Sequence, residues 1–443
     1  MPPAPHPTAL RIVRVLRDAG HEALFAGGCV RDMLSGIEPA DYDIATSAPA
    51  GAVARLFPKT VPVGAAFGVM IVVEDAREFE VATFRTEGPY RDGRHPESVG
   101  SSDARGDALR RDFTINGLFY DPVADTIIDY VGGEKDLRAK ILRTIGDPRE
   151  RFEEDRLRLM RAVRFTARFG LAMDPGTDRA LRELAGKITS VAAERVRDEL
   201  EKILVDPSRS AGMRRLADTG LLAHILPEAL AMRGVGQPPQ FHPEGDVFDH
   251  TLLCLEKLRD PDFVLALGTL LHDIGKPSTY QEADRIRFNR HEHVGADMTE
   301  EIARRLRISN EDRESVVWLV KSHLLFKDAP KMRLARLKRI LRHPGYFRLK
   351  ELHRVDVAAS HGDMTAWDYC EAMEKKFTEE DLRPRPLLRG QDLIAMGLAP
   401  GPLFSKILHA VEEHQLEGKI STREDAEALA REMAGVETRP GSP

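Results

Sequence analysis

The first third of the chain alternates short apolar runs with glycine turns, which is typical of a region that mixes strands and helices. Residues 8–20 repeat apolar positions at helical spacing and end at Gly20, so they predict an amphipathic helix. CVRDMLSG predicts a second helix. Strands are predicted at EALFAGG, DYDIAT, GVMIVV, FEVATF, FTINGLFYDP and TIIDYVGG, with the turn EDAR before FEVATF. Residues 86–107 are rich in glycine, serine and charge, and predict a long loop of a kind that often has a function.

From Arg151 onward the apolar spacing becomes helical and stays so to the C-terminal tail. Breaks are expected at Gly170, Gly186 and Pro207, and GQPPQFHPEGD (236–246) has the composition of a linker. These patterns predict an α+β fold, with a mixed sheet in the N-terminal part and helices after it. We expect a head at 1–148, a helical neck at 149–235, a histidine-rich helical domain at 236–365 and a helical tail at 366–443.

The composition narrows the class of protein. Hydrophobic residues make up 42% and charged residues 31% of 443, which is typical of a soluble globular chain with several domains. Three cysteines lie far apart without zinc spacing, which fits a reducing compartment. No apolar run is long enough to span a membrane and the start lacks a signal-peptide pattern, so we expect the cytoplasm. The net charge of −6 argues neither for nor against nucleic acid.

Two aspartates follow the Gly27-Gly28 turn within the segment DYDIAT. Asp41 and Asp43 are two residues apart in a predicted strand, so both side chains leave the same face. Neighbouring carboxylates repel each other unless a cation lies between them, and Mg²⁺ prefers such oxygen ligands. Glu80, on the predicted strand FEVATF, is expected to complete the acidic site. Magnesium ions there can serve phosphoryl or nucleotidyl transfer, with phosphate oxygens held at the glycine turn.

The combination GGCVRDMLSG and DYDIAT resembles the signature of class II tRNA nucleotidyltransferases and bacterial poly(A) polymerases. These proteins belong to the polymerase-β-like nucleotidyltransferase superfamily, so the resemblance implies that fold for the head. Further segments resemble the family in the same order, over about residues 10–230: FEVATFRTEGPYRDGRHP, RRDFTINGLFYDP (110–122), EEDRLRLMRAVRFTARFG (153–170) and ERVRDELEKIL (194–204).

The resemblance implies a nucleotide site built from these motifs. Two arginines of RRDFTIN would supply charge for a triphosphate, its asparagine would hydrogen-bond a ribose hydroxyl, and its aspartate would orient neighbours. The loop at 91–94 is expected to move when specificity switches from C to A, and its presence favours an enzyme that can add A. Gly117 and Phe119 depart from the usual ALA of this motif, which bears on fine specificity only. The residues concerned are Gly27, Gly28, Arg31, Asp32, Arg110, Arg111, Asp112 and Asn116.

The EDxxR motif is expected to choose the base. On one helix, five residues would project within an arc of roughly 120°, opposite an apolar face: Glu154, Arg158, Arg161, Arg164 and Arg168. Asp155 and Arg158 are three residues apart and would be surface neighbours, able to match the Watson–Crick edge of a base. The resemblance implies that this pair selects CTP and then ATP, with Glu154 as support. Taken alone, the motif also fits a solvated arginine-rich helix face.

Most of the histidines fall between 247 and 365. Imidazole and carboxylate groups bind divalent first-row metals. His272-Asp273 with distant His250 and Asp356 would hold one ion, and His291 with His323 a second. The ordered set, with LLHDIGKP, resembles the HD phosphohydrolase domain. It implies hydrolysis of phosphomonoesters or 2′,3′-cyclic phosphodiesters with a transition metal or Mg²⁺. Alternatively, the domain only binds RNA or stabilises the tail.

These expectations combine into a template-independent enzyme that builds or repairs the 3′-terminal CCA of tRNA from CTP and ATP, with Mg²⁺. A poly(A) polymerase or an enzyme adding only the terminal A shares the same motifs. A third alternative is a metal-dependent HD phosphohydrolase whose head only binds RNA. The basic helix predicted at 331–343 fits either contact with phosphates or a solvated face.

Overall fold

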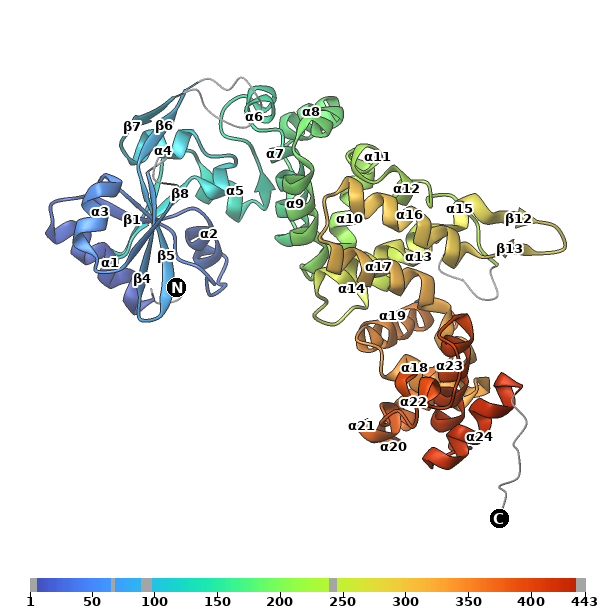
Figure 1. The fold of residues 1–443 in the computed structure, drawn as a ribbon. Helices are drawn as coiled ribbons and strands as arrows, with labels where there is room; N and C mark the ends of the chain where they lie inside the picture. Colours follow the sequence, from blue (N-terminus) through green and yellow to red (C-terminus); the bar gives the residue numbers. More distant parts are fainter. Residues whose placement is uncertain (1–5, 65–67, 89–97, 239–244, 436–443) are drawn as a thin grey trace, which may run out of the picture. The chain divides into compact units, whose positions relative to one another are not determined.

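The computed structural model describes residues 6–64, 68–88, 98–238 and 245–435. The chain forms two compact units. The first unit contains the chain up to Leu230 and the short segment Arg305–Ile308, and the second unit contains the rest. Figure 1 shows the first unit in blue to green and the second mostly in yellow to red.

A seven-stranded mixed sheet forms the centre of the first unit, as predicted. Its order is β3-β4-β5-β2-β1-β8-β9, and β2 and β5 are its parallel pair, while the other neighbours are antiparallel. The strands are β1 (Ala23–Ala26), β2 (Ile44–Thr46), β3 (Thr60–Gly64), β4 (Val69–Glu74), β5 (Arg77–Thr83), β8 (Leu118–Asp121) and β9 (Thr126–Asp129). The helices are α1 (Pro7–Asp18), α2 (Gly28–Leu34), α3 (Ala50–Leu56), α4 (Ala104–Leu109), the 3₁₀ turn η2 (Thr114–Asn116) and α5 (Gly133–Arg138).

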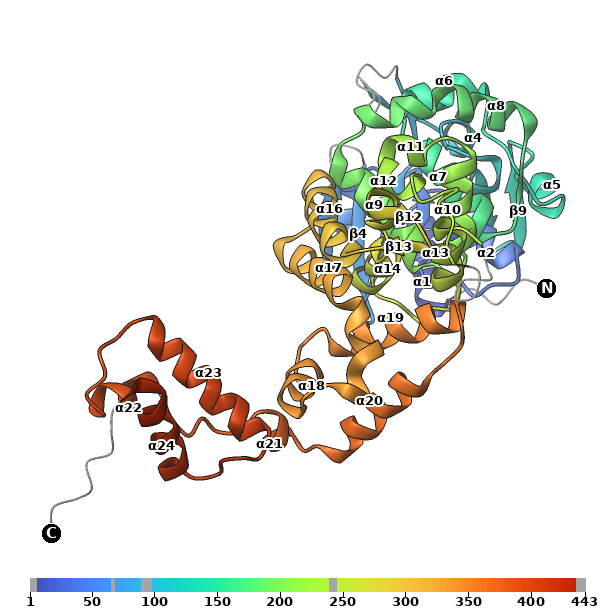
Figure 2. The same cartoon turned by 90° about the vertical axis from the view of Figure 1, so that its right-hand side faces the viewer.

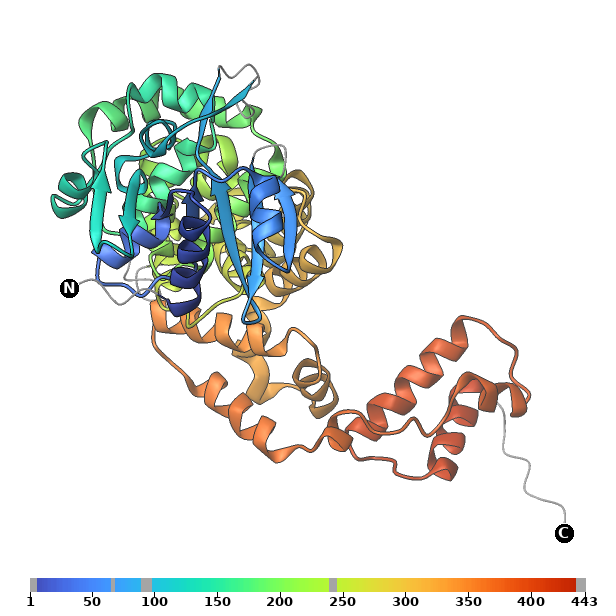
Figure 3. The same cartoon turned by 90° about the vertical axis from the view of Figure 1, so that its left-hand side faces the viewer.

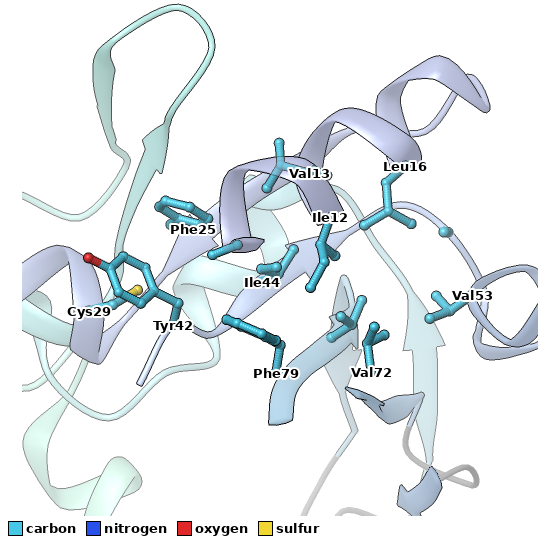
Figure 4. Packing of buried hydrophobic residues seen from close by; sticks show 14 of the residues in the cluster. Ile12, Val13, Leu16, Phe25, Cys29, Tyr42, Ile44, Val53, Val72 and Phe79 are labelled. Atoms are coloured by element: carbon cyan, nitrogen blue, oxygen red, sulfur yellow. The ribbon is translucent and has the colours of Figure 1, made fainter. Parts of the chain in front are cut away.

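Helices cover both faces of this sheet. On one face α1 and α3 pack on the strands, and Figure 3 shows α1 in dark blue against them. Figure 4 shows Ile12 and Leu16 of α1 above Ile44, within a cluster that also holds Tyr42. On the other face α4 packs through Ala104 and its neighbours. Burial of these apolar side chains fixes β1 and β2, the strands on either side of the aspartates in the sequence.

Two predictions for the head need correction. Asp41 and Asp43 lie just before β2, not within it, although the amide of Ala26 still bonds to the carbonyl of Asp43. Residues 86–107 are not all loop, because β6 (Arg85–Glu87) pairs with β7 (Val99–Ser101) and α4 follows. Asp103 accepts from the amide of Gly106 and so caps α4. This capping signal was overlooked because the segment is rich in glycine and serine. The expected loop at 91–94 lies outside the described residues.

The neck is helical, with ends near Gly170 and Pro207 as predicted. Its expected helix from Glu154 to Arg168 is broken, because Asp155 leaves the helical conformation and its side chain accepts from the amide of Leu157. The elements are α6 (Pro148–Glu154), α7 (Arg158–Arg168), α8 (Pro175–Leu184), η3 (Ala185–Ser190), α9 (Ala193–Val205), α10 (Arg209–Asp218), α11 (Leu222–Ile225) and α12 (Pro227–Leu230); β10 (Ile141–Leu142) pairs with β11 (Ala172–Met173).

The described residues of the second unit are mainly helical, and they also form a hairpin that the sequence did not predict, of β12 (Tyr280–Glu282) and β13 (Ile286–Phe288). Figure 2 shows the tail helices in orange and red. None of the described helices is both long and apolar enough to cross a membrane. The helices are α13 (Val247–Glu256), α14 (Phe263–Leu271), α15 (Lys276–Thr279), α16 (His291–Arg305), α17 (Asn310–Ser322), η4 (His323–Lys331), α18 (Leu334–Leu341), α19 (Tyr346–Ala359), α20 (Thr365–Lys376), α21 (Glu379–Leu382), α22 (Gly390–Ala395), α23 (Pro402–Leu416) and α24 (Arg423–Ala434).

The basic segment 331–343 forms α18 and its flanks. Arg339 and Arg342 both pair with Glu412 of α23, at 3.0 and 2.6 Å. Arg333 pairs with Glu413 at 3.2 Å. Part of the basic face is therefore neutralised by acids of the same unit.

Candidate functional site

A cavity of about 1050 Å³ in the first unit gathers nearly all of the predicted transferase residues. It lies where β1, β2 and β5 meet the neck helix α7. Of the predicted set, Asp32 is the one that does not line the cavity; its carboxylate instead binds Arg31 at 2.8 Å. The predicted residues that line it are Gly27, Gly28, Arg31, Asp41, Asp43, Glu80, Arg110, Arg111, Asp112, Asn116, Asp155, Arg158, Arg161 and Arg164.

The three acids reach this cavity through strand register. Tyr42 is buried and its ring packs edge-on to Phe25 at 5.2 Å, so the residues on either side of it point away from that core. Ile44 pairs with Val81 in the parallel β2–β5 ladder, which sets Asp43 and Glu80 side by side one step earlier. Burial of Tyr42 and the β2–β5 register therefore direct the carboxylates of Asp41, Asp43 and Glu80 into the same cavity.

The charge around Asp43 calls for a cation. Burial and the negative charge of Glu80 raise the pKa of Asp43 to about 6. The charge of Asp41 raises it further, while the nearby Arg111 acts to lower it. Mutual repulsion of carboxylates is relieved by a hard divalent ion, for which carboxylate oxygens are suitable ligands. In the described residues, compact groups of three or more metal-binding side chains occur only in the second unit. A cation on these three acids would therefore also need oxygens from a bound ligand.

A chain of buried polar groups connects the glycine turn to α7. Arg31 donates to Asn116 Oδ1 at 2.5 Å, and Asn116 Nδ2 donates to Asp112 Oδ1 at 3.0 Å. Arg161 donates from Nε and Nη2 to Asp112 Oδ2, at 2.8 and 2.6 Å. The Asn116 side chain, expected to meet a ribose, thus already binds two protein partners, while Asp112 has the orienting position that the motif predicts.

Asp112 is strongly held as an anion. Burial acts to raise its pKa, but the charge of Arg161 and the hydrogen bonds from Asn116 and Arg161 outweigh burial and lower the pKa to about 2. The amide of Phe113 also donates to Asp112 Oδ1 at 2.8 Å. Asp112 therefore fixes the direction in which Arg161 faces the cavity.

The paired arginines of RRDFTIN are held by one buried acid. Arg110 and Arg111 pair with the two oxygens of Asp107, at 2.6 and 3.0 Å. Arg111 Nη1 also donates to the carbonyl of Asn116 at 3.2 Å and lies so close to Gly27 that a Cβ there would be 2.5 Å away. Gly27 has φ +68, so glycine is needed both for this backbone and for the arginine. The two cations are thus fixed beside the glycine turn.

The side chains of Asp155 and Arg158 do not pair with each other, although the amide of Arg158 bonds to the carbonyl of Asp155 at 3.0 Å. Arg195 of α9 donates to both carboxylate oxygens of Asp155 at 3.0 Å. Arg158 is buried and instead donates to Glu154 Oε2 at 2.7 Å. Both residues still line the cavity, whereas Glu154 is not among the residues that line it and accepts from Arg158.

Four charged or aromatic residues that line the cavity were missed. Arg195 and Lys202 belong to ERVRDELEKIL, whose resemblance was noted but from which no single residue was assigned. Arg85 directly follows the strand FEVATF. The ring of Phe165 lies under Arg164, whose guanidinium is 4.3 Å from the ring centroid. The helical spacing of Arg195 and Lys202 was a signal that could have found them.

The second unit brings together all six predicted metal ligands, and four of them, Asp273, His291, His323 and Asp356, line a cavity of about 530 Å³. His272 and Asp273 follow the end of α14, and the other ligands come from α13, α16, η4 and α19. His250 Nε2 lies 3.1 Å from Asp356 Oδ1, and His291 Nε2 lies 3.4 Å from Asp273 Oδ1.

The grouping differs from the prediction. One compact group contains Asp273, His291 and His323, so the aspartate of the HD pair joins the two histidines expected to hold a second ion. The other group is His250, His272, Asp356 and a residue that the sequence did not predict, Cys254. The signal for Cys254 was its spacing of four residues from His250 on a helix.

The histidine tautomers leave lone pairs facing inward. His272, His291 and His323 each contact a backbone carbonyl through Nδ1, at 2.7, 2.9 and 2.7 Å. With Nδ1 protonated, a neutral ring has an unprotonated Nε2, and the Nε2 atoms of His291 and His323 face each other at 3.2 Å. Burial lowers the pKa of His323 to about 3, so this ring is neutral and its Nε2 has a lone pair. The facing Nε2 atoms of His291 and His323, and the buried Nε2 of His272 at 3.2 Å from Asp273 Oδ2, suit metal ions.

Comparison with known families matches the three parts of the chain to three models. Residues 23–143 match the poly A polymerase head domain, 170–232 the probable RNA and SrmB-binding site of polymerase A, and 247–373 the HD domain. An A-adding tRNA nucleotidyltransferase of Deinococcus radiodurans is 33% identical, over 95% of this chain and 97% of that enzyme. The chain belongs to the tRNA nucleotidyltransferase family.

Other members of this family match over different lengths. The CCA-adding enzyme of Geobacillus stearothermophilus is 43% identical over 222 residues, a match that covers 50% of this chain and only 55% of that enzyme. A crystal structure of the Bacillus stearothermophilus CCA-adding enzyme in complex with CTP is similar over 96% of this chain and 97% of its own, with a TM-score of 0.75 and 26% identity. The mixed-sheet head, helical neck and HD region predicted from the sequence are therefore confirmed.

Proposed function

We propose that this chain adds or repairs the 3′-terminal CCA of tRNA, using CTP and ATP without a nucleic-acid template. The observation that carries the proposal is the first-unit cavity, in which three carboxylates face a set of fixed arginines. A triphosphate has the charge that the arginines require, and its metal ions have the charge that the acids require. The similarity to CCA-adding enzymes, one of them in complex with CTP, supports the same substrates.

Asp41, Asp43 and Glu80 would hold two Mg²⁺ ions together with phosphate oxygens. Such ions, when bound, lower the pKa of the attacking 3′-hydroxyl of tRNA and offset charge on the phosphates. The hydroxyl attacks the α-phosphorus and pyrophosphate leaves. The chain's own contribution is position: Arg110 and Arg111, fixed by Asp107, face the triphosphate, so the cations need no rearrangement as charge develops.

The base would be read by α7 and the residues before it. Asp155 can accept from the base edge while Arg195 orients it, and Arg158 and Arg161 present donors to the same cavity. Phe165 and Arg164 offer a flat apolar and cationic surface for a ring. Under this proposal residues 1–148 carry the transfer, 149–235 the base selection and 236–443 the HD site and tail.

An enzyme that adds only the terminal A is the second candidate. The observation that favours it is the match to the Deinococcus A-adding enzyme along nearly the whole chain, because the Geobacillus match covers only half. A poly(A) polymerase shares the same cavity residues. The CCA-adding enzyme, the A-adding enzyme and the poly(A) polymerase differ in the RNA that they extend and in the length of the product. Analysis of the reaction products therefore distinguishes them, whereas the cavity residues do not.

Substitution of the acids tests the proposed transfer. D41A and D43A should each abolish nucleotide incorporation with Mg²⁺ while the melting temperature stays close to that of the wild type, because both acids are partly exposed and hold no strand. D18A, which removes an exposed acid of the same unit, is the control and should incorporate normally. Full activity of D41A or D43A would overturn the assignment.

We also propose a metal-dependent phosphohydrolase at the HD cluster, supported by the facing Nε2 atoms of His291 and His323. A transition metal or Mg²⁺ there would supply an activated water for phosphomonoesters or 2′,3′-cyclic phosphodiesters. Lys276, 2.6 Å from Asp273, can also bind substrate phosphate. The expected result is hydrolysis of these substrates, to free phosphate from a monoester and to a phosphomonoester from a cyclic diester, which H291A abolishes while nucleotide incorporation is unchanged. The cytoplasmic location stays a prediction.

A further inference from the structure

Cys254 lies inside the HD cluster, where no motif predicts it. It follows His250 by four residues on α13, so one helical turn presents both side chains on the same face. Both side chains are fully buried. The chain's other cysteines, Cys29 and Cys370, belong to α2 and α20 and to neither metal-binding group. A buried cysteine is often a small apolar core residue, so its contacts must decide its role.

The contacts of Cys254 have the spacing of metal ligands. Its Sγ lies 3.4 Å from His250 Nε2, which lies 3.1 Å from Asp356 Oδ1. One ligand atom each of His250, Cys254, His272 and Asp356 lies within 4.8 Å of the other three. In a tetrahedral site with bonds of about 2.3 Å to sulfur and about 2.0 Å to nitrogen, those two atoms lie about 3.5 Å apart. The observed separation therefore fits two ligands of one ion.

Hydrogen bonds alone do not satisfy this group. If His250 Nε2 is protonated, it donates to Asp356 and cannot accept from the thiol; if it is not, its lone pair faces a carboxylate oxygen. His272 Nε2 is buried and lies 3.2 Å from Asp273 Oδ2, but it makes no hydrogen bond of good geometry in the described part of the chain. A buried polar atom without a partner is costly, whereas one cation satisfies all four groups at once.

We propose that Cys254 is a thiolate ligand of one metal ion in the HD cluster, with His250, His272 and Asp356. This assignment rests on the proposed metal-dependent function of that cluster. Because thiolate is a soft ligand and Mg²⁺ prefers oxygen, this subsite takes a zinc-like first-row ion in preference to Mg²⁺. Binding releases the thiol proton to solvent. The subsite of Asp273, His291 and His323 contains no sulfur.

Cobalt(II) is the probe for this ligand, because a cobalt–thiolate bond gives a charge-transfer absorption band in the near ultraviolet that nitrogen and oxygen ligands do not give. The full-length chain is freed of metal, loaded with Co²⁺ and examined by metal analysis and absorption spectroscopy. C254A is the test variant. C370A is the matched control, since it removes the same thiol from another buried position of the same unit.

We expect the wild type and C370A to bind cobalt with the thiolate band. C254A should lack the band and bind the first ion at least about tenfold more weakly, while its second subsite still loads. A wild-type chain that binds cobalt without the band, or one that binds none, overturns the proposal, and neither result needs C254A to fold. A thiolate band that persists in C254A also overturns the proposal. Hydrolysis of phosphate esters is measured separately: its absence with the band intact counts against the phosphohydrolase, and the ligand assignment stands.

Discussion

Replacing Asp112 by asparagine removes one negative charge and almost no volume from the centre of the first-unit cavity. In the wild type its two oxygens accept from the Arg161 guanidinium, Asn116 Nδ2 and the Phe113 amide. An asparagine can keep the bonds from Asn116 and Phe113 with its oxygen, but its NH₂ then faces the donors of Arg161. D112N should therefore both destabilise the first unit and release Arg161.

The pKa gives the magnitude. A fall from the ordinary 3.8 to about 2 is close to two pH units, and each unit is worth about 1.4 kcal/mol. The ionised form of this buried group thus contributes about 2 kcal/mol to the free energy of unfolding. Because the folded pKa is the lower one, this contribution is present above pH 3.8 and is lost as the pH falls through 2. Near pH 3 about half of it should remain.

The assay is thermal and denaturant unfolding of the full chain at pH 7 and near pH 3, with kcat/KM for CTP and ATP. At pH 7, D112N should lower the melting midpoint of the first unit by about 4–8 °C and kcat/KM by about tenfold. The control is D136N, another buried acid of this unit, bound to Thr114 and Arg143 but outside the cavity. It should destabilise the unit and leave kcat/KM close to the wild-type value.

An unchanged midpoint for D112N at pH 7 would refute the claim that Asp112 is held as a stabilising anion. A stability difference of equal size at pH 7 and pH 3 would refute the cause given for it, because the loss would then come from packing. Loss of stability with normal kcat/KM would show that Arg161 needs no orienting partner.

Three further changes probe the glycine turn, the base selector and the metal cluster. G27A should lower nucleotide incorporation by more than about tenfold, since its Cβ would lie 2.5 Å from Arg111 Nη1. The control G36A has open space around its Cβ and should cost only about 1 kcal/mol of stability. Equal incorporation rates in the two variants would contradict this prediction. R195M should change the ratio of kcat/KM for CTP and ATP by about tenfold, because it frees Asp155, the carboxylate that we propose reads the base; an unchanged ratio would show that Arg195 has no part in base selection. H323A should lose bound divalent metal by elemental analysis yet incorporate nucleotides normally, and full metal content would exclude it as a ligand.

Residues close in sequence were the ones that could be predicted. DYD, GG and RRDFTIN place their chemistry by local register, and the buried Tyr42 between Asp41 and Asp43 is enough to turn both acids to one side. The pairing of β4 with β5 likewise follows from the alternation of apolar and polar residues and from a two-residue turn at Asp75 and Ala76. Short-range patterns carry this information because they decide both the local backbone and the buried face.

Partners far apart in sequence were missed. Helical periodicity predicts one continuous helix over 154–168. It contains no information on the hydrogen bond from the amide of Leu157 to the Asp155 side chain, which accompanies the end of α6. The true partner of Asp155 is Arg195, 40 residues away, and only the packing of α9 brings it there. For the same reason the division of the metal ligands into two groups, and the membership of Cys254, depend on how five segments pack.

The most direct test of the central claim uses three labelled tRNAs, one without CCA, one ending in C and one ending in CC. Each is incubated with the full chain, Mg²⁺ and CTP, ATP or both, and the products are sequenced. The account predicts that all three end in CCA and that extension stops at the terminal A. Addition of A to the CC end alone would contradict CCA synthesis and assign an A-adding enzyme, a long A tail would assign a poly(A) polymerase, and no incorporation at all would contradict the transfer itself.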